Sequence, residues 1–163
     1  MELVDGCLEV LPMPTDRHQA VLDALLVVLL AYASQEGGRA RSAGLRVRLR
    51  SGRFREPDLV FLSKARLHLR GPEFWTGADL MMEVVSGGAD DRVRDLVIKR
   101  REYAAAGVPE YWIVDPEAET ITVLRLDGDP YVTHGVFGRG ARATSAAFSG
   151  FSVDVTLIFD AAN

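Results

Sequence analysis

The apolar residues near the start of the chain recur at the three- and four-residue intervals of an amphipathic helix. This spacing covers residues 16–34, where Thr15 or Asp16 can cap the helix and Gly37-Gly38 can end it. The longest apolar run, residues 24–33, is about half of the ~20 residues that cross a bilayer. The pattern therefore predicts a helix with one buried face and no membrane span.

Strand patterns follow this helix. Residues 39–50 alternate apolar and charged side chains, which predicts a strand with one buried face. Ser51-Gly52 then predicts a hairpin turn. Residues 59–62 and 80–85 are almost continuously apolar, as in strands that are covered on both faces at the centre of a sheet. The remaining expected elements are strands at residues 111–114, 121–126 and 131–136 and a last element at residues 151–159.

A second helix is predicted between the apolar segment at residues 80–85 and the strand at residues 111–114. Asp90 or Asp91 can cap its start. Gly107, followed by Pro109, is a stop signal that ends the helix near residue 106. The predicted helix therefore runs from about residue 90 to residue 106.

Composition and charge narrow the class of protein. A length of 163 residues suits one domain with its own core. Cys7 is the only cysteine, which excludes a disulfide framework and favours a reducing, cytosolic location. The net charge is −4, yet residues 39–55 hold seven arginines and no acid. Such a concentrated basic segment can attract phosphate on an acidic protein.

Two acids lie within the apolar strands. Asp58 and Glu83 are each flanked by valine, leucine or methionine, and a buried carboxylate needs a partner such as a divalent cation. The alternative is a strand-end acid in water, which suits Asp58 better than Glu83. Asp95, Lys99 and Tyr103 recur every four residues and so share one helix face. They are either part of a site or an exposed ion pair beside an aromatic anchor.

Other polar residues leave two interpretations open. Arg46, Arg48 and Arg50 on one strand face could follow a DNA backbone, or could keep an exposed strand from aggregating. His18 could join a site from the first helix, or could simply pack or hydrogen-bond at the helix start. Neither choice is decided by the residue pattern alone.

Four motifs carry a family resemblance. In chain order they are Pro57-Asp58-Leu59-Val60, Met82-Glu83-Val84-Val85-Ser86, Asp95-Leu96 with Lys99 and Tyr103, and Gly107-Val108-Pro109-Glu110-Tyr111-Trp112-Ile113-Val114-Asp115-Pro116. With these motifs the sequence resembles the Uma-type restriction endonucleases of the PD-(D/E)XK nuclease superfamily, most densely over residues 55–125, and His18 also resembles a common family position.

The resemblance implies a fold and a reaction. It implies a single restriction-endonuclease-like α/β domain over residues 1–163, with a central mixed sheet flanked by helices. It further implies that Asp58 and Glu83 hold Mg²⁺ or Mn²⁺ and that the reaction is hydrolysis of DNA. Lys99 would stabilise charge on the phosphate or orient the attacking water, with Asp95, Tyr103 and His18 as accessory residues. A homodimer is expected for cutting two strands, on fold analogy alone.

Two departures from the superfamily pattern keep other functions open. Val85 stands where the strand lysine is usual, so Lys99 would have to replace it from the helix. Residues 86–91 carry two acids where relatives tend to have Ser-Pro-Ser. The main alternative is a non-catalytic nucleic-acid-binding or mobile-element accessory protein with a nuclease-like fold. A third is a self-associating structural domain whose acids are solvated.

Overall fold

A six-stranded mixed sheet forms the centre of the molecule in the computed structural model, which describes residues 2–4, 6–9, 13–86 and 88–162. The order is β11-β10-β9-β8-β6-β3, with β8 and β9 parallel and the other neighbours antiparallel. This is the mixed α/β architecture that the sequence predicts. The bounds are β3 (Arg39–Ser42), β6 (Leu59–Leu62), β8 (Leu80–Val84), β9 (Glu110–Asp115), β10 (Thr120–Leu126) and β11 (Tyr131–Phe137).

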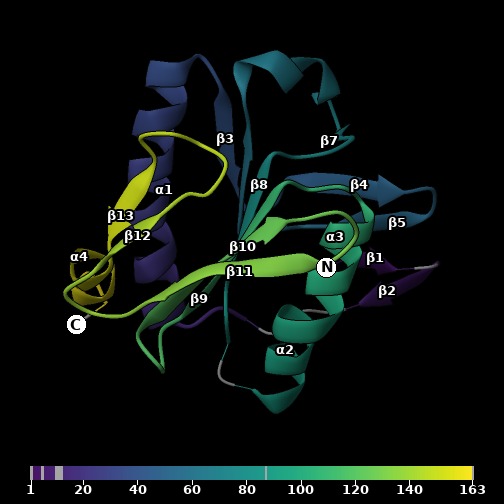
Figure 1. The fold of residues 1–163 in the computed structure, drawn as a ribbon. Coiled ribbons are helices and arrows are strands. Elements are labelled where there is room, and N and C mark those ends of the chain that lie inside the picture. The colour runs from purple at the N-terminus through teal and green to yellow at the C-terminus, as the bar shows by residue number, and fades with distance from the viewer. Residues whose placement is uncertain (1, 5, 10–12, 87, 163) are drawn as a thin grey trace.

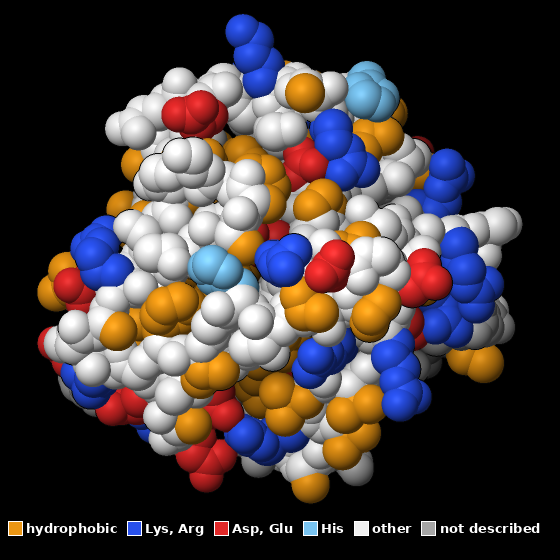
Figure 2. Space-filling view, in the orientation of Figure 1, with side chains coloured by type: hydrophobic (Ala, Val, Ile, Leu, Met, Phe, Trp, Pro, Cys, Tyr) orange, Lys and Arg blue, Asp and Glu red, His pale blue; other side chains and the backbone are white. Residues whose placement is uncertain are grey.

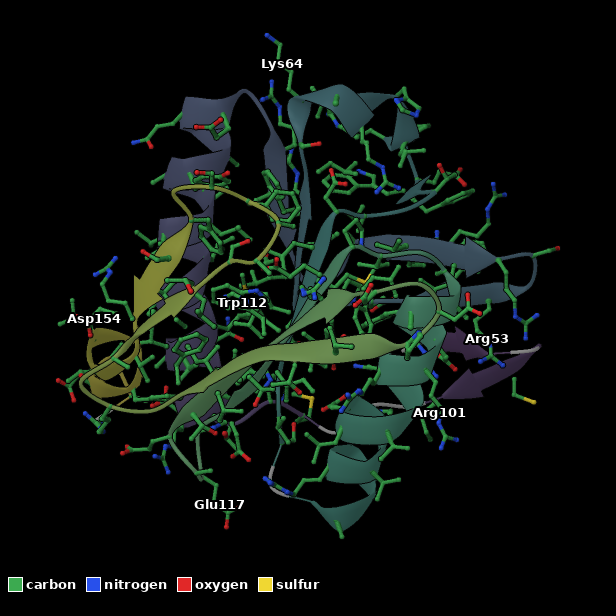
Figure 3. The ribbon with its side chains drawn as sticks, viewed as in Figure 1. Arg53, Lys64, Arg101, Trp112, Glu117 and Asp154 are labelled. Atoms are coloured by element: carbon green, nitrogen blue, oxygen red, sulfur yellow. The ribbon has the colours of Figure 1, made fainter. Side chains whose placement is uncertain are left out.

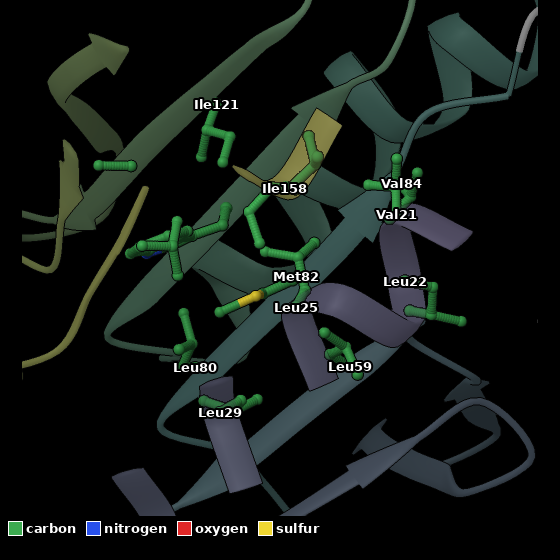
Figure 4. Packing of buried hydrophobic residues seen from close by; sticks show 14 of the residues in the cluster. Val21, Leu22, Leu25, Leu29, Leu59, Leu80, Met82, Val84, Ile121 and Ile158 are labelled. Atoms are coloured by element: carbon green, nitrogen blue, oxygen red, sulfur yellow. The ribbon is translucent and has the colours of Figure 1, made fainter. Parts of the chain in front are cut away.

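One face of the sheet is covered by α1 (Asp16–Glu36), as Figure 1 shows. Thr15 caps the helix by accepting the His18 backbone N–H, and Gly37 ends it with φ 71°. By length and composition α1 could cross a membrane. Its apolar face instead packs on β6 and β8 (Figure 4), as the helix prediction requires. The buried helix side chains are Val21, Leu22, Leu25, Leu29 and Ala33.

The C-terminal elements cover the same face beside α1. They are β12 (Arg142–Thr144), β13 (Ser152–Asp154) and α4 (Val155–Asp160). The final element predicted at residues 151–159 is thus a short strand followed by a helix, which begins where Asp154 caps the Leu157 N–H. Phe151 and Phe159 are buried in this core.

The other face of the sheet packs against a helical segment and a second sheet. The segment consists of α2 (Ala89–Val93), the π-helix η2 (Arg94–Ile98) and α3 (Lys99–Ala105). The second sheet has the order β2-β1-β5-β4-β7 and lies beside α3 in Figure 1. Its bounds are β1 (Glu2–Val4), β2 (Cys7–Glu9), β4 (Arg46–Arg50), β5 (Arg53–Arg55) and β7 (Phe74–Trp75), with the 3₁₀ helix η1 (Lys64–Leu69) before β7.

Two of the predicted element boundaries are wrong. The alternating segment at residues 39–50 is not one strand, because the chain turns at Gly44 (φ 96°) between β3 and β4. β3 then pairs with β6, whereas β4 pairs with β5 and β7 in the other sheet. The second helix already begins at Ala89, so Asp90 and Asp91 lie inside α2 and neither occupies the cap position.

Glu110 at the start of β9 explains part of the most distinctive motif. Its carboxylate is fully buried and accepts the Trp112 indole N–H at 2.5 Å and the Ser145 hydroxyl at 3.0 Å. The backbone N–H groups of Ala146 and Ala147 donate to the same carboxylate. The labelled Trp112 lies in the molecular interior in Figure 3. This segment of the motif therefore ties the loop before β13 to the central sheet.

Candidate active site

Asp58 and Glu83 meet because β6 and β8 are neighbours in the sheet. The antiparallel register pairs Leu59 with Met82, so the residue before Leu59 lies opposite the residue after Met82. Side chains alternate along a strand, and Glu83 therefore faces the same side as Met81 and Val85, toward α3. Asp58, which directly precedes β6, lies on that side too. The structure thus brings the two predicted acids together on one cavity.

Glu83 is buried, with only 2% of its side chain exposed. Lys99 Nζ lies 2.8 Å from Oε2, and the Tyr103 hydroxyl donates to Oε1 at 2.6 Å. Both partners come from α3 and are themselves buried. The prediction that Lys99 and Tyr103 share an inward helix face is confirmed, and the interpretation of Lys99 as an exposed surface partner is wrong.

Asp95 completes this network from η2. Its Oδ1 atom lies 3.0 Å from Lys99 Nζ, and its backbone carbonyl accepts the Tyr111 hydroxyl at 2.9 Å. In η2 the Lys99 N–H bonds to the Arg94 carbonyl five residues earlier, which is the π-helical pattern. Lys99 is therefore held between two carboxylates, those of Asp95 and Glu83.

Asp58 is the more accessible acid, with 18% of its side chain exposed. Its Oδ2 atom accepts the Val84 N–H at 2.8 Å, a bond that orients the carboxylate along the end of β8. His18 Nε2 lies 3.4 Å from the same oxygen. The helix cap at Thr15 positions His18 one turn into α1, and the structure thus brings His18 to the site.

Charge and burial shift the protonation equilibria of this site. Burial raises the pKa of Glu83 to about 8; Lys99 opposes the shift, whereas Asp58 and Asp95 add to it. Burial also raises the pKa of Asp95, again against the effect of Lys99. For His18, burial lowers the pKa, but the hydrogen bond and negative charge of Asp58 outweigh it, and the pKa is raised above 6.5. Lys99 thus lies within 3.0 Å of two acids, Glu83 and Asp95, and Asp58 lies near enough to raise the pKa of both.

A cavity of about 310 Å³ opens onto these groups. A neighbouring cavity of about 400 Å³ shares Met13, His18 and Ser86 with it, so the hollow continues past His18. Glu83 and Lys99 border the first cavity from its buried end. Its polar lining residues are His18, Gln19, Glu56, Asp58, Glu83, Ser86, Arg94, Asp95 and Lys99.

Arg94 is a charged residue of the cavity lining that the sequence did not predict, as are the polar residues Gln19, Glu56 and Ser86. It borders the cavity, and its Nε atom lies 3.8 Å from Asp95 Oδ1. A regular α-helix would turn Arg94 away from the face that carries Asp95 and Lys99. The π-helical turn is what places it there, and no periodicity in the sequence signals that turn.

The arginines for which DNA contact is one of two interpretations lie away from this cavity. The exposed side chains of β4 are those of Arg46, Arg48 and Arg50, as the alternation predicts. None of the three is among the described residues that line the cavity. Arg55 is buried and paired with Glu102, and Arg53 shares the same carboxylate. In Figure 2 basic side chains are interspersed with acidic ones on the visible face. The basic segment at residues 39–55 is split between the two sheets, because β3 belongs to the central sheet and β4 and β5 to the other.

The donor chemistry of the site suits a hard cation. Asp58 and Glu83 supply carboxylate oxygens, and Mg²⁺ is commonly bound by one or two carboxylates with water and phosphate as its other ligands. Among the residues that the structure describes, no three His, Cys, Asp or Glu side chains converge as a complete metal-binding group. Two carboxylates bordering an open cavity nevertheless fit a metal that keeps several water ligands.

The fold is that of a restriction-endonuclease-like α/β protein. A crystal structure of a nuclease, described as putative, from Anabaena variabilis superimposes with a TM-score of 0.77 at 20% identity, over 99% of this chain and 90% of that chain. The Uma2 family model, described as "Putative restriction endonuclease", matches residues 1–156. The chain therefore belongs to the Uma2 family, as the resemblance implies. A search of curated proteins found no match.

Proposed function

We propose that this protein is a Mg²⁺- or Mn²⁺-dependent endonuclease that hydrolyses DNA phosphodiester bonds in the cavity bordered by Asp58 and Glu83. The observation that carries the proposal is the meeting of Asp58, Glu83 and Asp95 at the wall of one cavity, where burial and the neighbouring acids raise the pKa of Glu83 although Lys99 opposes the shift. A divalent cation bound by Asp58 and Glu83 would stabilise their ionised forms and so offset the cost of burying them together.

Asp58 and Glu83 are the residues that would hold the metal. A bound Mg²⁺ or Mn²⁺ would neutralise phosphate charge and favour formation of hydroxide from water. The hydrogen bond from the Val84 N–H fixes Asp58, and Tyr103 fixes one oxygen of Glu83. These bonds hold both carboxylates at the cavity wall before any ligand arrives, which is the pre-organisation that catalysis requires.

Lys99 is proposed to stabilise negative charge that develops on the phosphate. Its Nζ atom is held within 3.0 Å of both Glu83 and Asp95, at the wall of the cavity that Asp58 also borders. Val85 occupies that strand position and is packed in the core. The geometry thus supports replacement of the strand lysine by Lys99. An ammonium beside a phosphate can stabilise the charge that develops in the transition state.

The test is metal titration followed by a cleavage assay. Calorimetric titration of Mn²⁺ into wild type, Asp58→Asn and Glu83→Gln should show one site that both substitutions weaken. Wild type should then cleave a DNA mixture of linear, circular and single-stranded molecules in Mg²⁺ or Mn²⁺, and Lys99→Met should not. Metal and DNA binding without cleavage would instead favour the non-catalytic nucleic-acid-binding alternative.

A homodimer would supply the two active sites needed to cut both strands of a duplex. Light scattering at several protein concentrations, with and without DNA, tests this part of the proposal. A monomer under all conditions would limit the reaction to one strand per encounter.

A further inference from the structure

Arg94 lies on a different side of its helical segment from Arg100 and Arg101. It is the first residue of η2, and the Lys99 N–H bonds to its carbonyl across five residues. The wider π-turn leaves both Arg94 and Asp95 one turn before Lys99, so all three border the catalytic cavity. Arg100 and Arg101, by contrast, border a separate hollow on the outer side of the segment.

The side chain of Arg94 is largely enclosed, with 19% exposed. Its Nε atom lies 3.8 Å from Asp95 Oδ1, close enough for an electrostatic interaction but too far for a hydrogen bond. A guanidinium carries five N–H donors in a planar fork, which allows it to serve a carboxylate and a second anion together. The same cavity contains the two carboxylates to which we assign the metal.

We propose that Arg94 is a phosphate-binding residue of this site, donating hydrogen bonds to the non-bridging oxygens of the phosphodiester. The inference rests on the proposed function and adds a second cation to it. Lys99 lies between two acids at the buried end of the cavity, and Arg94 brings a planar guanidinium to the lining of the same cavity. Planar bidentate recognition of phosphate is the task for which arginine is better suited than lysine.

The competing role for Arg94 is to balance the charge of Asp95 without touching substrate. Both roles predict that removing the guanidinium leaves Mn²⁺ binding intact or stronger, because a repelling cation is lost. Only phosphate binding predicts weaker affinity for an oligonucleotide and weaker inhibition by inorganic phosphate. If Arg94 binds phosphate, oligonucleotide affinity therefore falls while Mn²⁺ affinity does not.

The experiment compares Arg94→Gln and Arg94→Lys with Arg101→Gln, which removes the same charge from the outer side of α3. Binding of a fluorescent oligonucleotide in Mn²⁺, KM, kcat and inhibition by phosphate are measured, with Mn²⁺ titration as the control. For Arg94→Gln we expect oligonucleotide affinity to fall and KM to rise by roughly 10- to 100-fold, since hydrogen bonds to charged groups are being removed. Arg94→Lys should lie between Gln and wild type, and Arg101→Gln should match wild type.

Equal oligonucleotide affinity, KM and phosphate inhibition in Arg94→Gln and Arg101→Gln would overturn the inference. Because Arg94→Lys keeps the charge beside Asp95, it separates loss of phosphate contact from failure to fold, which thermal melting also checks. Wild type that binds DNA in Mn²⁺ without cleaving it would contradict the catalytic proposal alone, and the Arg94 comparison would still be decided by affinity. Wild type that binds neither Mn²⁺ nor DNA would contradict both.

Discussion

Glu83 and Glu110 are two buried glutamates in parallel neighbouring strands of the same sheet, yet their surroundings differ in kind. Glu110 accepts hydrogen bonds from an indole, a hydroxyl and two backbone N–H groups, all of them neutral. Glu83 has one lysine and one tyrosine hydroxyl as partners, and two more acids nearby raise its pKa further. Both carboxylates are buried, but the groups that stabilise them differ.

The comparison shows why burial of an acid is weak evidence for a site. The Glu110 carboxylate accepts four hydrogen bonds and so ties β9 to a distant loop. It borders none of the described cavities. Glu83 instead borders a cavity, where burial and two neighbouring acids raise its pKa. A perturbed protonation equilibrium beside an opening is a feature that active sites share.

The largest expected effect comes from Glu83→Gln. This change keeps the shape of the side chain but removes the charge, and we expect Mn²⁺ affinity to fall by more than about 100-fold, since loss of an outer-shell partner alone costs about 10- to 100-fold. Cleavage should be lost with it. Calorimetric titration and a cleavage assay measure the two effects.

The fold should survive Glu83→Gln. The folded-state pKa of Glu83, about 8, lies above its ordinary value of 4.5, so its contribution to stability is complete below pH 4.5 and is lost as the pH rises through about 8. Above pH 8 the variant should therefore melt no lower than wild type. Collapse of the variant at pH 9 would show that Glu83 is a structural residue like Glu110.

Glu110→Ala should affect stability and leave the site alone. It leaves the Trp112 indole and two backbone N–H groups without their acceptor, at an expected cost of about 3 kcal/mol in the free energy of unfolding. Urea denaturation measures this loss, and Mn²⁺ affinity of the folded variant should equal that of wild type. A variant with normal stability and weakened metal binding would reverse the assignment of the two glutamates.

The sequence could predict the local parts of the site and missed the parts that depend on backbone detail. The four-residue spacing of Asp95, Lys99 and Tyr103 suffices to place them together on one helix face. Contact between Asp58 and Glu83 depends on pairing of β6 with β8, a long-range event that only the family resemblance anticipated. Arg94 was missed because one π-turn changes which residues face inward.

The basic segment illustrates a different limit. Alternation correctly predicts that Arg46, Arg48 and Arg50 are exposed, because side-chain period follows from strand geometry. It does not predict that residues 39–42 and 46–50 join different sheets, since that depends on which strands are available as partners. Nor does charge alone show that Arg55 is buried with Glu102.

Metal affinity should rise with pH in wild type. Glu83 carries a proton up to about pH 8, because burial and the neighbouring acids outweigh Lys99. Metal binding must displace that proton, so Mn²⁺ affinity should increase by up to about tenfold per pH unit below pH 8 and then level off. Titrations in two buffers of different ionisation enthalpy, from pH 6 to 9, count the released protons. Affinity that does not change with pH would mean that Glu83 is already ionised and that its surroundings resemble those of Glu110.

Tyr103→Phe should give the smallest effect and the finest test of the comparison. The change removes one hydroxyl that donates to Glu83 Oε1 and keeps the ring that packs edge-on against Tyr111. We expect a loss of about 1 kcal/mol in stability at neutral pH, typical of one hydrogen bond. Because that bond favours the ionised carboxylate, its loss raises the pKa of Glu83 and moves the rise in Mn²⁺ affinity to higher pH. A stability loss without that displacement would mean that Tyr103 supports the core only, as Ser145 supports the loop at Glu110.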